Sequence, residues 1–137
     1  MAGYYFSKKL GGFGGFFLAQ SVEEHQHGMK FFEFINDNMG RTLIPGVKAP
    51  KNDFKSVTEP VELALEYEKE GTSRLYNLMN DAVAAKEHAT ANFLKWFIDE
   101  QVREVAALES LINKIKLVGL EGSGLFMLDK KFGAQSA

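Results

Sequence analysis

The chain has 137 residues, of which 45% are hydrophobic and 25% charged, and its formal net charge is -2. This length allows one domain with a sizeable core, and the charge gives no reason to expect nucleic acid or a membrane surface as a partner. The sequence has no cysteine, which excludes disulfides, thiolate metal sites and cysteine nucleophiles. The lack of cysteine also fits a reducing cytosol, and no apolar run is long enough to cross a bilayer, so we expect a cytoplasmic protein.

The first half of the chain predicts a short segment, a long helix and a long connection. Residues 1–8 are short and aromatic, and four closely spaced glycines predict a loop near residues 8–12. Helical periodicity covers residues 13–39, and Gly40 is the predicted C-cap. Residues 40–58 contain two prolines and little periodicity, which in an all-helical chain indicates a crossover between helices.

Three further helices are predicted after the crossover. Thr58 and Pro60 mark the start of a helix over residues 59–86. The next helix, over residues 89–118, has a sustained three-four spacing of Phe93, Phe97, Gln101, Glu104, Leu108, Leu111 and Ile115. A short helix is expected over residues 125–132. No strand signal is present, so the fold class is all-α, with a single domain over residues 1–137.

Polar side chains interrupt the apolar stripes of the three long helices. Glu24 and His27 are three residues apart, so they lie on one helix face and can hold one metal ion together. Glu70 lies on the next helix, and Gln101 and Glu104 lie on the last long one. Burying several carboxylates is costly unless a cation binds them, and carboxylates with one imidazole suit iron or manganese. A chance Glu-x-x-His or a solvated acidic face is the competing interpretation for any one of these helices.

Three segments resemble bacterial non-haem ferritins. They are AQSVEEHQHGMKFFEFIND at 19–37, NFLKWFIDEQVRE at 92–104 and GSGLFMLDK at 122–130, and the similarity extends from residue 1 to about residue 132. The resemblance implies a ferritin-like four-helix bundle with a long crossover and a short fifth helix. It also implies a cage of twenty-four subunits that stores iron as a ferric mineral, with ferroxidase activity at a di-iron centre in each subunit. The oxidant of Fe(II) would be dioxygen or peroxide.

The resemblance also assigns ligands position by position. The di-iron ligands would be Glu24, His27, Glu70 and Gln101. An accessory third iron site would be formed by Glu23, Glu100 and Glu104. Arg103 stands where that site often has another glutamate, so the accessory site has an arginine in place of one of its usual ligands. Rubrerythrins and bacterioferritins usually carry a second Glu-x-x-His on the last helix, so Gln101 and Glu104 favour the non-haem ferritin branch.

The N-terminal residues resemble the end of the family's first helix. Most of that helix, including a glutamate ligand to the first iron, has no counterpart in the sequence. We therefore expect the chain to be part of a longer protein, and the cage to form if the first helix is restored; a truly truncated protein is the alternative. The alternative function is a non-catalytic structural subunit that co-assembles with complete ones. A di-iron peroxidase of the rubrerythrin type is a third hypothesis.

Overall fold

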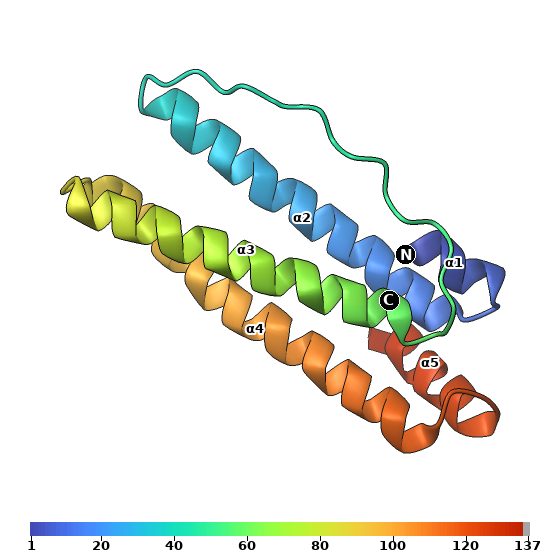
Figure 1. Cartoon of the computed structure of the whole chain (residues 1–137). Helices are drawn as coiled ribbons and strands as arrows, with labels where there is room; N and C mark the ends of the chain where they lie inside the picture. The colour runs from blue at the N-terminus through green and yellow to red at the C-terminus, as the bar shows by residue number, and fades with distance from the viewer. Residues whose placement is uncertain (136–137) are drawn as a thin grey trace. The chain divides into compact units, whose positions relative to one another are not determined.

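The computed structural model describes residues 1–135 (Figure 1). Over these residues it has no strand, and its five helices are α1 (Ala2–Ser7), α2 (Gly11–Asp37), α3 (Glu59–Ala84), α4 (His88–Val118) and α5 (Ser123–Gln135). The all-α prediction is confirmed. The chain divides into two compact units: α1, α2 and α5 belong to one, and α3 with α4, in Lys55–Leu120, forms the other.

An aromatic core holds α1, α2 and α5 together. Tyr5 of α1 is fully buried, with its ring centroid 5.3 Å from that of Phe13 and 5.5 Å from that of Phe17. Phe132 of α5 joins the same cluster, 5.6 Å from Phe13 and 5.5 Å from Phe16. Large, rigid rings from all three helices therefore meet in the core of this unit, together with the buried Leu10, Leu125 and Leu128.

The start of α2 differs from the prediction. The glycines were expected to form a loop up to residue 12, but the helix begins at Gly11. The Asp129 carboxylate on α5 accepts a 2.8 Å hydrogen bond from the Phe13 N–H, one of the donors that a helix start leaves without an internal partner. A Cβ at Gly12 would lie 1.7 Å from the Asp129 backbone oxygen, so glycine allows α5 to cross closely here. A tertiary contact therefore overrides the low helix propensity of glycine.

The second unit is an antiparallel pair of long helices. α3 and α4 are joined by a turn of three residues, 85–87, and pack along their length (Figure 1). Six of the seven residues of the predicted α4 stripe are buried; Phe93 is only half-buried, and Leu94 and Ile112 are buried beside the stripe. An ion pair between Lys69 on α3 and Glu109 on α4, 3.0 Å long, bridges the two helices at the surface. Surface pairs of this kind contribute little, so apolar packing stabilises the pair.

Three helices end in the same backbone motif. After α1, α2 and α3 a non-glycine residue adopts positive φ: Lys9 at 62°, Met39 at 62° and Lys86 at 59°. The next residue then donates its N–H back to the helix, as Gly40 does to the Ile35 oxygen at 2.9 Å. This is the Schellman arrangement, in which glycine is the usual residue at the positive-φ position. Gly40 was predicted as the cap of α2, but it lies beyond the positive-φ position, which Met39 occupies.

Among the described residues, none of the helices combines the length and the hydropathy that crossing a membrane requires.

Candidate metal centre

Glu24 and His27 form a candidate ligand pair on α2. The His27 Nδ1 lies 3.6 Å from the Glu24 Oε1, as expected for residues three apart on one helix face. The imidazole is 16% exposed and the carboxylate 51% exposed, so the pair lies at the edge of the buried surface. A neutral imidazole nitrogen and a carboxylate oxygen at this separation can bind one transition-metal ion.

Gln101 and Glu104 form a second pair, on α4. Both side chains are buried, at 9% and 7% exposed, although they interrupt an apolar stripe. They are also three residues apart and so share a helix face. Burial of a carboxylate requires compensating polar partners or a cation, so this pair is a candidate to face a charged ligand.

Gln101 is anchored on α3 through its amide nitrogen. Nε2 donates to the Glu68 Oε2 at 3.0 Å, to the Glu68 backbone oxygen at 3.0 Å and to the Thr72 Oγ1 at 3.2 Å. Glu68 is half-buried. A carboxylate on α3 and an amide on α4 are thus held together by direct hydrogen bonds.

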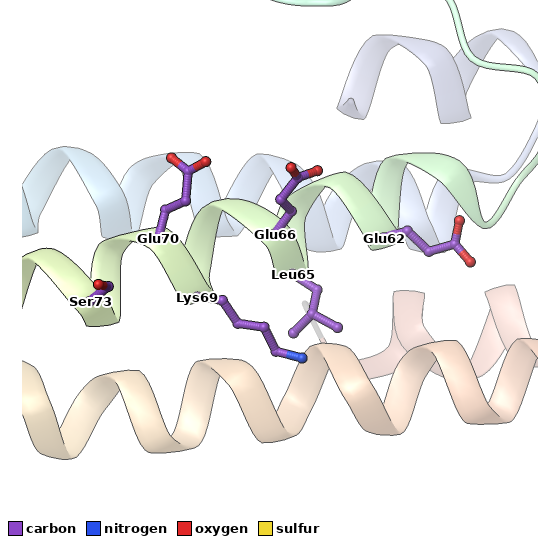
Figure 2. Close-up of a pocket in the computed structure, with 6 residues that line it drawn as sticks. All are labelled: Glu62, Leu65, Glu66, Lys69, Glu70 and Ser73. Carbon is purple, nitrogen blue, oxygen red and sulfur yellow. The ribbon is translucent and has the colours of Figure 1, made fainter.

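Glu70 lies elsewhere on α3. Two residues on a helix differ in direction by about 200°, so Glu68 and Glu70 face nearly opposite ways. The Glu70 carboxylate is 54% exposed and accepts a 3.2 Å bond from the Arg74 guanidinium. Figure 2 shows Glu66 and Glu70 pointing away from α4, along a shallow pocket of about 540 Å³ that is lined by α3 residues, whereas Lys69 extends toward α4. The structure therefore brings Glu68, and not Glu70, to Gln101.

The signal for Glu68 was present in the sequence. One line of residues at three-four spacing on α3 is buried or half-buried throughout, namely Val61, Leu65, Glu68, Thr72, Leu75, Met79 and Ala82. From the sequence we expect one face of this helix to carry Leu63, Tyr67, Glu70, Leu78 and Met79, but Tyr67 is 53% exposed and Leu78 48% exposed. A count of that spacing from Val61 through Ala82 places Glu68 on the inward stripe.

The three residues of the predicted accessory site have different surroundings. Glu23 is exposed and accepts a 2.7 Å hydrogen bond from the Gln20 amide. Glu100 on α4 accepts a hydrogen bond from the Arg103 guanidinium, and that bond, followed by the charge of Glu100, raises the pKa of Arg103. Glu104 is buried on the Gln101 face of α4, as described above. The guanidinium therefore competes with any cation for the Glu100 carboxylate.

Comparisons with known proteins agree on one family. A family model described as the ferritin-like domain matches residues 1–118. The bacterial non-heme ferritin of Staphylococcus aureus is 39% identical over 136 residues, which cover 99% of this chain and 82% of the relative. That of Staphylococcus saprophyticus is 37% identical, with 99% of this chain and 81% of the relative covered.

Solved structures lead to the same family. The open-pore ferritin of the hyperthermophilic archaeon Archaeoglobus fulgidus is 34% identical, with a TM-score of 0.94 over 97% of this chain and 82% of that one. A form of the same ferritin that was closed by site-directed mutagenesis gives a TM-score of 0.93, again at 34% identity and 97% of this chain, and with 81% of that chain covered. The family model, the sequence similarity over 99% of this chain and the fold agree, and the chain belongs to the ferritin family, among the bacterial non-haem ferritins.

Proposed function

We propose that this chain is an iron-storage subunit that binds Fe(II), oxidises it with dioxygen or peroxide at a di-iron ferroxidase centre, and retains the product as a ferric mineral. The observation that carries the proposal is the pair of polar side chains, Gln101 and Glu104, buried on the otherwise apolar stripe of α4. In a ferritin, buried oxygen ligands on that helix are best explained by a cation substrate.

We assign the ligands to Glu24 and His27 on α2, Glu68 on α3 and Gln101 on α4. Glu68 replaces Glu70 in this set because it is hydrogen-bonded to Gln101, whereas Glu70 is paired with Arg74. The support comes from two ligand pairs, Glu24 with His27 and Glu68 with Gln101, each formed within its own unit.

The chemistry of the donors suits oxidation followed by release. Carboxylate oxygens are hard ligands that stabilise Fe(III) more than Fe(II), and so they favour loss of an electron from the bound ion. The Gln101 amide is neutral and therefore a weaker ligand than a carboxylate. An ion held partly by an amide can leave after oxidation, which is what delivery of iron to a mineral requires.

The remaining assignments belong to the same proposal. The chain acts in the cytoplasm as a homo-oligomer, a cage of twenty-four subunits, with iron ions as both substrate and cargo. An accessory site formed by Glu23, Glu100 and Glu104 is weakened by Arg103, since its guanidinium already occupies Glu100.

The test is the rate of aerobic Fe(II) oxidation, followed by the absorbance of the ferric product. We expect Glu68→Ala, and the double change Glu24→Ala with His27→Ala, to lower the initial rate at least about tenfold. Glu70→Ala is the matched control: the same residue type is removed from the same helix two positions away, and the rate should stay within about twofold of the unmodified chain.

The outcomes separate the competing functions. An unmodified chain that oxidises Fe(II) no faster than buffer, while retaining its helical circular dichroism, would support the non-catalytic structural subunit. A rapid reaction that stops once the ligand sites are filled, with no further uptake, would support a di-iron peroxidase. A larger loss from Glu70→Ala than from Glu68→Ala would overturn the ligand assignment on α3.

A further inference from the structure

The orientation of the Gln101 side chain is defined by what surrounds its nitrogen. Nε2 is within 3.0–3.2 Å of three oxygen atoms: two of Glu68 and the hydroxyl of Thr72. A primary amide is planar, with its nitrogen and its carbonyl oxygen on opposite sides of the terminal carbon. Since the nitrogen faces α3, the carbonyl oxygen Oε1 is directed away from these three acceptors.

The Thr72 hydroxyl acts as an acceptor toward Gln101. Its single proton is donated to the Glu68 backbone oxygen, at 2.8 Å, one helical turn earlier. The lone pairs that remain on Oγ1 face the Gln101 Nε2 at 3.2 Å. If the amide were flipped, its carbonyl oxygen would face the two Glu68 oxygens with no proton between them, and the Thr72 hydroxyl would have to give up its bond to the preceding turn to donate to it.

We propose that Thr72 is a positioning residue that fixes the amide of Gln101, so that Oε1 is the atom presented to iron and Nε2 holds the Glu68 carboxylate. That iron is the ion bound by Oε1 rests on the proposed function. The orientation of the Gln101 amide is a property of the metal-free chain. An amide nitrogen has no lone pair to offer a metal, so the direction in which Gln101 points decides whether it can be a ligand at all.

The residue type at position 72 suits this role. Threonine on a helix commonly bonds its hydroxyl to the carbonyl of the preceding turn, which commits the proton. Its β-branch restricts χ1, so Oγ1 is held in one place.

The first experiment is a double-mutant cycle on the metal-free chain, with urea midpoints as the readout. Thr72→Val keeps the shape of the side chain but removes the acceptor, and Gln101→Leu removes the amide. If the hydroxyl acts through the amide, the two losses of midpoint are non-additive, and Thr72→Val has little further effect once Gln101 is leucine. Additive losses would overturn the proposal, whether or not the chain binds metal.

The second experiment measures Co(II) binding by calorimetry, with Co(II) as a redox-stable substitute for Fe(II). We expect Thr72→Val to weaken binding about tenfold, the size of effect seen when a partner that orients a metal ligand is lost. Thr72→Ser retains the hydroxyl and should stay within about twofold. Thr90→Val makes the same chemical change about 16 Å along α4 from Gln101 and should have no effect.

The two experiments test separate claims, so a negative result in one does not decide the other. If the unmodified chain does not bind Co(II), the proposed function is wrong, and the urea cycle still decides whether Thr72 holds the amide. If binding is tight and Thr72→Val matches the unmodified chain in both assays, the proposed function stands and the role of Thr72 is rejected.

Discussion

Tyr5 is the most deeply buried phenolic side chain of the described residues. It is fully buried and contacts Tyr4, Phe13 and Phe17. Burial, and to a lesser extent the neighbouring Tyr4, raises the pKa of Tyr5 well above the ordinary value of a tyrosine. A charged phenolate is poorly solvated among aromatic rings, so this group stays protonated in the folded chain at a pH where it ionises in the unfolded chain.

This difference predicts alkaline destabilisation. Below about pH 10 the phenol is neutral in both states and its contribution is fully present. As the pH rises further, the unfolded chain loses the proton and the folded chain keeps it, so the free energy of unfolding falls by about 1.4 kcal/mol per pH unit. Tyr5→Phe should remove this slope, measured by urea unfolding between pH 9 and pH 11.

The control is another tyrosine. Tyr76 is 49% exposed, and Tyr76→Phe should leave the alkaline slope as it is in the unmodified chain. Equal slopes for Tyr5→Phe and the unmodified chain would show that the phenol at position 5 ionises in the folded state.

The residues of the proposed site differ in how far the sequence alone can identify them. Glu24 and His27 are read directly from the sequence because one helical turn brings them together. Which of Glu68 and Glu70 lies at Gln101 depends on which face of α3 points inward, and two acids two residues apart make that prediction sensitive to the register. The hydrogen bonds from Gln101 to α3 join residues 33 and 29 positions apart, which periodicity within one helix does not encode.

The start of α2 gives a sharp prediction at the scale of an element. Gly12→Ala would place a Cβ 1.7 Å from the Asp129 backbone oxygen, and a backbone atom cannot move aside as a flexible side chain can. We expect a loss of at least about 3 kcal/mol in the free energy of unfolding, because α5 must shift away from α2. Thermal and urea unfolding would measure it.

Gly15→Ala is the matched variant in the same turn of helix. A Cβ there meets nothing within 4 Å, so alanine should stabilise the chain by about 1 kcal/mol through its higher helix propensity. If both alanines stabilise the chain, the close crossing of α2 and α5 does not exist in solution.

The elements differ in how far the sequence could predict them. The stripe of α4 was predicted correctly from Phe97 onward because an uninterrupted three-four spacing dominates any local preference. The start of α2 was placed two residues late because the contact that stabilises it comes from Asp129, 116 positions along the chain from Phe13. The end of α2 was misassigned because a methionine occupies a position where glycine is usual.

At the scale of the whole molecule, one face of α2 is apolar and exposed. Leu18, Val22, Met29 and Phe32 are 54%, 53%, 40% and 40% exposed. At 100° per residue these four positions fall within about 80° of one another, so they form a stripe along the helix, which the exposed His25 interrupts. Exposed apolar side chains gathered on one face are unfavourable in water, and a second copy of the same chain can cover them through a symmetric contact.

We therefore expect Leu18→Glu with Val22→Glu to reduce the oligomer, because two carboxylates placed in the stripe would be buried and would repel the same pair on the partner. Light scattering coupled to size exclusion should show a lower mass, with unchanged helical circular dichroism. Leu18→Met with Val22→Ile preserves the apolar surface and should retain the mass of the unmodified chain. If the glutamate variant assembles fully, this stripe is not a contact between subunits, and the homo-oligomer must be built on other surfaces.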